Sequence, residues 1–168
     1  MKVKKLIVLA VMALCMCLSL PAFADSMDVT TINLTVNGMA IDGSACSNPD
    51  GAMCLPLLPV AEALGYTTEV SELSDGDAYR VVYTLTPAPD EDGDTGSQLM
   101  VAYSIENEMP SAVAISKDQV LLPLKQSMML VDSQPYMPTE FFETGMCVAF
   151  TYDDDTQTLD MTCVVYDD

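Results

Sequence analysis

Four of the six cysteines, those that lie after residue 24, are the residues of this chain whose type and spacing point most directly to chemistry. They are Cys46, Cys54, Cys147 and Cys163, and in an exported chain their even number favours disulfides over zinc. Four cysteines allow three pairings. Cys46 and Cys54 flank the turn at 48–51 symmetrically, so a local bridge between them is reasonable. A second bridge, between the other two cysteines, would then follow by default.

Side-chain alternation argues against that second bridge. If Val148 and Phe150 face the core, Leu159 of the returning strand faces it with them. The same alternation turns Cys163 inward and Cys147 outward, unless a β-bulge shifts the register. Cys163 is therefore expected to stay reduced in the core or to reach across to the first half of the chain.

Acidic residues offer a second set of candidates. Asp90, Asp92 and Asp94 have the spacing that opens an EF-hand calcium loop. An EF-hand also needs a glycine at its sixth position and a glutamate at its twelfth, where this chain has Thr95 and Val101. We therefore expect a solvated acidic loop at 87–97, and a hairpin tip rather than a metal site at the second acidic run, 153–155.

Groups for enzyme catalysis are poorly represented. Glu62 and Glu140 could form the carboxylate pair of a glycoside hydrolase only if both face one cleft, and each falls on a short helix where a solvent-facing Glu is routine. A cysteine nucleophile usually relies on histidine, which the chain lacks. Methionine sulfur selects Cu(I), but the methionines are scattered in a way that suits core filling. We expect no catalytic residue, no cofactor and no metal site.

Residues 1–24 are typical of a secretory signal peptide. A basic start precedes an apolar run from Leu6 to Leu20, and Ala22-Phe23-Ala24 fits a cleavage site. The apolar run is about 15 residues, shorter than the roughly 20 that span a bilayer. We therefore expect residues 25–168 to form one secreted domain that is not inserted in a membrane once the signal is cleaved.

The expected mature chain is strongly acidic. It keeps only Arg80, Lys117 and Lys125 against 25 carboxylates, which gives a formal charge of −22. Binding of nucleic acid needs clustered Lys and Arg, so nucleic acid is excluded as a partner, and an anionic membrane is disfavoured for the same reason. The simplest reason for the charge is solubility outside the cell.

A motif that occurs twice organises the predicted elements. At 55–66 and at 136–145, a proline leads a short helix that closes on a glycine and is followed by β-type sequence. Asn37-Gly38 predicts a tight hairpin turn between strands at 31–36 and 39–41. Further strands are expected at 67–70, 79–86, 99–105, 113–115, 120–124, 148–152 and 158–165, whereas 128–131 is poorly determined.

These residues resemble a known family, the N-terminal-type domain of copper amine oxidases, which is common as a stalk or stand-alone module in secreted bacterial proteins. The resemblance rests on Val36-Asn37-Gly38, on the helix motif at 55–65 and on the strand ending in Val70, with 136–145 and 148–153 as a second occurrence. Leu58 stands where the family usually has Arg. In the oxidases that the chain resembles, histidines of a separate catalytic domain hold the copper. The oxidase chemistry does not carry over, because this chain has no histidine.

We therefore expect an α+β fold in which two strand-hairpin-plus-short-helix units pack as one small domain, with the acidic loop between its halves. The expected function is that of a secreted, non-catalytic binding or structural module at the cell envelope, whose partner is a cell-wall component or an extracellular protein. Two alternatives remain open: a secreted hydrolase that uses acidic residues, and an acidic protein that binds divalent cations.

Overall fold

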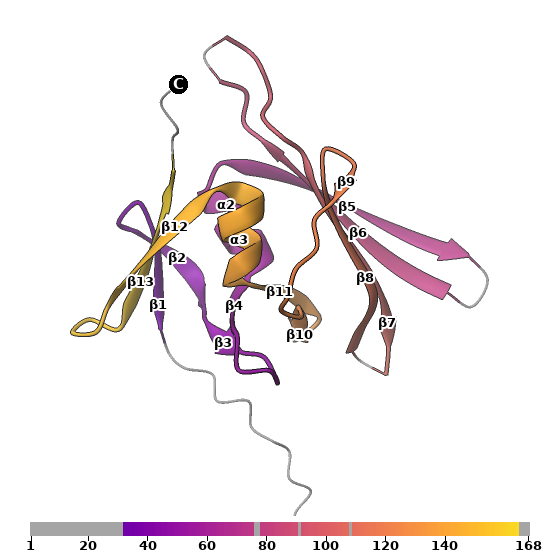
Figure 1. The fold of residues 1–168 in the computed structure, drawn as a ribbon, viewed down its shortest axis with the longest axis horizontal. Helices are drawn as coiled ribbons and strands as arrows, with labels where there is room; N and C mark the ends of the chain where they lie inside the picture. The colour runs from indigo at the N-terminus through magenta and orange to yellow at the C-terminus, as the bar shows by residue number, and fades with distance from the viewer. Residues whose placement is uncertain (1–31, 76–77, 91, 108, 165–168) are drawn as a thin grey trace, which may run out of the picture.

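A computed structural model describes residues 32–75, 78–90, 92–107 and 109–164. The predicted signal peptide, residues 1–24, lies outside these ranges. The described chain folds mainly into three β-sheets, with 57% of residues in strands and 12% in helices (Figure 1). The expected α+β class is therefore wrong, and the fold is β-rich.

The three sheets are called the terminal, the central and the long sheet. In spatial order, the terminal sheet contains β12 (Val148–Asp153), β13 (Thr158–Cys163), β1 (Asn33–Val36) and β2 (Met39–Ser44). The central sheet contains β10 (Met129–Val131), β11 (Gln134–Pro138), β4 (Met53–Pro56) and β3 (Cys46–Ser47). The long sheet contains β5 (Tyr66–Asp75), β6 (Ala78–Pro87), β7 (Leu99–Glu106), β8 (Met109–Lys117) and β9 (Val120–Leu121). The helices of the described chain are α2 (Leu57–Ala63) and α3 (Thr139–Met146).

The fold class differs from the expectation because the strands run past their apolar cores while the helices stay short. The sequence predicts a strand at 67–70, and β5 spans ten residues because it pairs with β6 along its whole length. It likewise predicts a strand at 113–115, and β8 spans nine residues. Pairing with a neighbouring strand thus keeps polar, exposed residues in an extended conformation, even where the sequence shows little alternation of apolar and polar residues.

Two segments of the chain repeat the same order of elements. In the first unit, residues 46–87, hairpin β3–β4 leads into α2 and then into hairpin β5–β6. In the second unit, residues 129–163, hairpin β10–β11 leads into α3 and hairpin β12–β13. β4 and β11 pair with Leu55 opposite Met137, both fully buried, and residues 54 and 56 pair with 138 and 136. This register relates the two units by a local twofold axis between Leu55 and Met137.

Both helices begin after a proline and are followed within two residues by a left-handed residue. Pro56 and Pro138 are the N-caps, in the extended conformation. Gly65, with φ of 84°, and Cys147, with φ of 56°, each lie nine positions after the cap proline. The sequence predicts Gly145 as the end of the second helix, but Gly145 is buried inside α3, where a Cβ would lie 3.3 Å from a leucine of β7. The two motifs therefore have equal lengths, and their glycines are not equivalent.

The main core is shared by all three sheets and both helices. Alternate residues of β6 and β7 are paired and buried: Val81, Tyr83 and Leu85 oppose Tyr103, Val101 and Leu99. The rings of Tyr83 and Tyr103 stack with centroids 6.1 Å apart. From α3, Phe141 and Phe142 are fully buried and meet edge to face at 5.2 Å. One core spans both units, from Leu34 of β1 to Met161 of β13.

The turn after β1 agrees with the sequence. Asn37 and Gly38 both have positive φ, 51° and 76°, which confirms the tight hairpin turn between β1 and β2. The acidic loop at 87–97 joins β6 to β7, which are neighbours in the long sheet.

None of the helices in the described ranges is long and apolar enough to cross a membrane.

Candidate functional site

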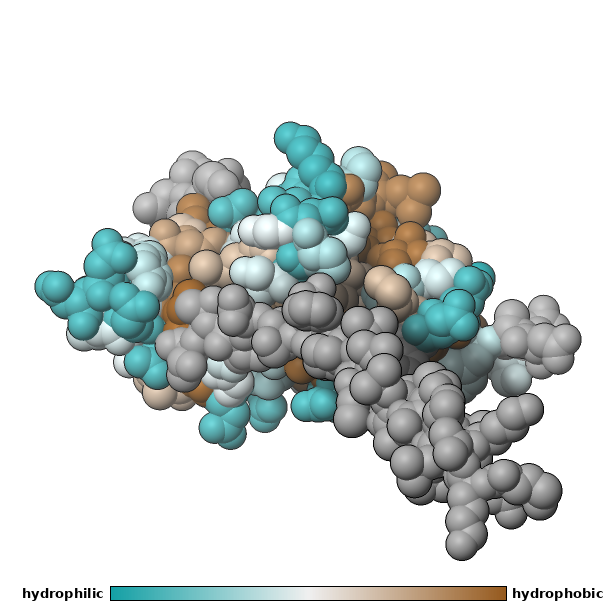
Figure 2. Space-filling view, turned by 90° about the horizontal axis from the view of Figure 1, so that it is seen from below, coloured by the Kyte–Doolittle hydropathy of each residue, from teal (hydrophilic) through white to brown (hydrophobic). Residues whose placement is uncertain are grey.

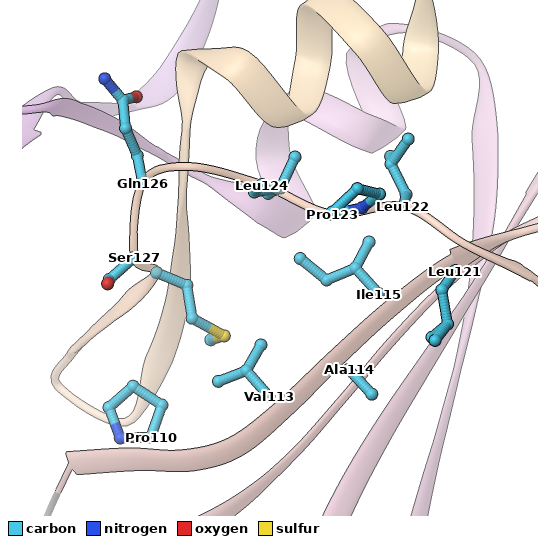
Figure 3. Close-up of a pocket in the computed structure, with 11 residues that line it drawn as sticks. Pro110, Val113, Ala114, Ile115, Leu121, Leu122, Pro123, Leu124, Gln126 and Ser127 are labelled. Carbon is cyan, nitrogen blue, oxygen red and sulfur yellow. The ribbon is translucent and has the colours of Figure 1, made fainter.

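A groove lies between β8 and the segment that follows β9 (Figure 3). This β8 groove has a volume of about 530 Å³ and is lined chiefly by Val113, Ile115, Leu121, Leu122, Leu124 and Met128. Val113 is 43% exposed and Leu121 is 73% exposed, so apolar side chains reach the surface. Figure 2 shows hydrophobic side chains gathered on the long-sheet side of the face that it presents.

The groove runs beside the open edge of β8. β9 pairs only with Ser116 and Lys117, and the N–H of Leu122 adds one bond to the Ile115 carbonyl. Among the described residues no strand continues this ladder along the rest of β8. A β-bulge at Ala112 and Val113, where Ala112 has φ of 48°, interrupts the pairing of β8 with β7 beside this edge. An extended segment in the groove would therefore meet both apolar side chains and an unpaired strand edge.

The far wall of the groove is held in place by Glu140 of α3. Its carboxylate accepts the backbone N–H groups of Lys125 and Gln126, at 2.8 and 3.3 Å. Gln126 and Ser127 are the only polar residues that line the groove in the described chain. The sequence marks Glu140 as a possible catalytic acid, and in the structure its carboxylate holds the backbone of the groove wall.

The second catalytic candidate, Glu62, lies elsewhere. It is exposed on α2 and lines a hollow of about 430 Å³ together with Asp42, apolar neighbours such as Leu58, and Gln134 of β11. Glu140 is not among the residues that line this hollow. The structure therefore does not bring Glu62 and Glu140 to one cleft, which is what a hydrolase built on this pair needs.

The acidic runs form local turns. Asp90 accepts the backbone N–H groups of Asp92 and Asp94, at 3.0 and 2.9 Å, so its carboxylate closes its own loop. At the tip of β12–β13, hydrogen bonds from the Thr156 hydroxyl and from the backbone N–H of Asp155 lower the pKa of Asp153. Across the described ranges, no group of three or more acidic, Cys or His residues is arranged to hold a metal ion.

The first cysteine pair is buried. Cys46 lies directly opposite Cys54 in the β3–β4 hairpin, and both side chains belong to a small cluster with Met129. Burial, together with the neighbouring Cys46 thiol, raises the pKa of Cys54 to about 12. Burial also raises the pKa of Cys46. Both are free thiols in the structure, and the local bridge stays a prediction that their facing positions permit.

The second cysteine pair is more exposed. Cys163 pairs with buried Val148, so it lies on the face that alternation predicts, but it is exposed because it ends β13 beyond the core. The expectation that Cys163 is buried is therefore wrong. Cys147 is half-buried at the end of α3, and its carbonyl accepts the N–H of Val164 at 2.8 Å. Both are free thiols.

The residues of the β8 groove carry no chemical signal that singles them out in sequence. Leu121, Leu122 and Leu124 fit a predicted strand at 120–124, and Pro123 is the one clue that this strand must end early. β9 indeed stops at Leu121, and the following residues become the wall of the groove.

Comparisons with protein-family models, curated proteins and solved structures give no match for this chain. The resemblance to the N-terminal-type domain of copper amine oxidases therefore rests on the sequence motifs alone.

Proposed function

We propose that the protein is a secreted, non-catalytic binding module whose β8 groove takes an extended apolar segment of an extracellular or envelope protein. The observation that carries the proposal is the coincidence of an apolar groove with the open edge of β8. Strand addition of this kind draws affinity from main-chain hydrogen bonds and specificity from alternate side chains that enter pockets.

The composition of the groove favours a protein segment over a cell-wall glycan. A glycan would need several polar groups to pair with its hydroxyls, and this lining offers the side chains of Gln126 and Ser127 only. The acidic surface favours a partner of net positive charge, because complementary charge speeds the encounter of two proteins. Added salt is then expected to slow the association of the two proteins and to leave their dissociation rate nearly unchanged.

A library of phage-displayed 12-residue peptides, selected against residues 25–168, tests the proposal. The selected peptides should be apolar at alternate positions, and their binding is then measured by fluorescence anisotropy. Val113→Glu places a charge in the groove at a side chain that is already 43% exposed. The matched control is Met39→Glu, where the side chain is 67% exposed on β2 of the terminal sheet; β2 and β8 lie on opposite sides of the molecule (Figure 1).

Val113→Glu should raise the Kd at least tenfold, whereas Met39→Glu should leave it within about twofold, since only the first charge meets an apolar ligand. Equal binding by the two variants, both folded by circular dichroism, would reject the β8 groove as the site.

A further inference from the structure

Three sulfur-bearing side chains from three strands of the central sheet form one buried cluster. β3 and β10 are the two edge strands of this sheet, yet their side chains touch, with Cys46 Sγ only 3.4 Å from Met129 Sδ. Cys54 lies opposite Cys46 on the neighbouring strand. The Cys46–Cys54–Met129 cluster thus brings together two thiols and one thioether from three strands.

This sulfur cluster is shielded from solvent. Cys46, Cys54 and Met129 are 2%, 0% and 5% exposed. The partly buried side chains that pack against them are Val131 and Tyr136. The Ser127 carbonyl lies 3.9 Å from Cys54 Sγ. The cluster therefore presents soft sulfur donors almost exclusively.

A surface hollow borders the cluster at Met129. It has a volume of about 390 Å³, and its lining includes Met109, Met128 and Met129 together with Asp50. Met109 is 62% exposed at its mouth, and Met129 is shared between this methionine hollow and the sulfur cluster. Cys46 and Cys54 do not line this hollow, so Met129 is the one ligand of the cluster that borders it.

We propose that the Cys46–Cys54–Met129 cluster is a binding site for one Cu(I) ion. Soft thiolate and thioether ligands select Cu(I), whereas structural zinc sites take four Cys or His ligands and do not use methionine. A trigonal ion at about 2.3 Å from each sulfur sets the sulfurs roughly 4 Å apart, so the 3.4 Å contact has to open by a few tenths of an ångström. Binding releases the two thiol protons to solvent, and no electron is transferred.

The site is independent of the β8 groove proposed above, and it competes with a disulfide between Cys46 and Cys54, because both states use the same thiols. The test therefore starts from reduced protein, residues 25–168, under anaerobic conditions. Cys147→Ser and Cys163→Ser are present throughout, so that the second thiol pair cannot bind the metal. Cu(I) is supplied as its bicinchoninate complex, whose loss of absorbance reports transfer to the protein.

Met129→Leu is the decisive variant, because it removes the thioether and nearly conserves the volume of the side chain. Met128→Leu is the matched control, since Met128 is equally buried but packs in the main core. The parent should take one Cu(I) per chain. Met129→Leu should weaken binding at least tenfold, Met128→Leu should change it less than twofold, and Cys46→Ala should abolish it.

X-ray absorption at the copper edge should show sulfur neighbours alone. Failure of the reduced parent to compete with bicinchoninate, or equal affinity of Met129→Leu and Met128→Leu, would overturn the proposal. So would protein recovered from the culture medium with Cys46 and Cys54 fully bridged. Val113→Glu should bind Cu(I) like the parent, which separates this test from that of the groove.

Discussion

The first unit, residues 46–87, and the second unit, residues 129–163, use one plan with different side chains. Each places its helix directly after a cap proline, and a left-handed residue follows the helix nine positions after that proline. At equivalent positions on the buried side, α2 has Val60 where α3 has Phe142, and both are fully buried. The two units thus share their backbone plan, but the side chains at equivalent core positions differ in volume.

The two units also differ in what is added to their second hairpin. The hairpin β5–β6 gains β7, β8 and β9 in one antiparallel sheet, and the β8 groove forms at the far edge of this addition. The hairpin β12–β13 gains β1 in parallel and β2 beyond it. The candidate binding site therefore belongs to the extension of one unit, and the symmetric centre serves as its support.

The largest expected effect compares the two helices at their equivalent core positions. Phe142→Ala should lower the free energy of unfolding by about 3–5 kcal/mol, because it removes a buried ring and leaves a cavity. Val60→Ala removes far less volume and should cost roughly 2 kcal/mol. Urea unfolding followed by circular dichroism measures both losses of stability. Equal losses would show that Val60 and Phe142 contribute equally to the core.

The next effect concerns the packing of α3 against the extension of the first unit. A Cβ at Gly145 would lie 3.3 Å from Leu99 and 3.6 Å from Leu122, so Gly145→Val should overpack this contact and cost about 1–3 kcal/mol. The equivalent residue of α2 is Ala63, which is half-buried and already carries a Cβ. Ala63→Val is the control and should cost less than 1 kcal/mol on helix propensity. A similar cost at both positions in urea unfolding would contradict the close approach.

A smaller effect of opposite sign is expected where the helices end. Gly65 has φ of 84° with open space around it, so Gly65→Ala should cost about 1–2 kcal/mol through backbone strain alone. Cys147 has φ of 56° at the equivalent position, and Cys147→Gly should relieve that strain and stabilise the protein by about 1 kcal/mol. Thermal unfolding of both variants in reducing buffer measures the two signs. Destabilisation by Cys147→Gly would mean that the cysteine side chain contributes packing at this position.

The repeated motif was accessible from sequence, because a cap proline and the apolar residues after it leave a local pattern. The equivalence of Gly65 with Cys147 was not, since a left-handed cysteine has no sequence signature and Gly145 offered a misleading match. The length of β5 also escaped prediction. Its outer half, Ser71–Asp75, is polar and is held extended by pairing with β6 rather than by its own alternation.

The candidate sites depended on contacts that no local pattern encodes. The β8 groove arises because β9 pairs with only two residues of β8 and leaves the rest of that edge open. The sulfur cluster needs Cys46 and Met129 to meet across 83 positions of sequence. The acidic loop, in contrast, was predictable, because the Asp90 carboxylate accepts hydrogen bonds from its near neighbours in sequence, Asp92 and Asp94.

The smallest expected effect is a dependence on pH at the junction of the second unit with β1. Asp160 of β13 accepts the hydroxyl of Thr35 and the backbone N–H of Gly38, and these bonds lower its pKa. A lowered pKa adds stability that is fully present above the unfolded-state value of about 3.9 and is lost as pH falls through the folded-state value. Asp160→Asn keeps the size of the side chain and removes the titration, so its unfolding midpoint should fall less than that of the parent between pH 5 and about pH 2.5. Asp154, an exposed residue of the hairpin tip, provides the control Asp154→Asn, whose acid sensitivity should match the parent. Parallel loss of stability in acid by the parent and by Asp160→Asn would show that this carboxylate does not tie β1 to the second unit, and would leave the main-chain pairing of β1 with β13 as the link.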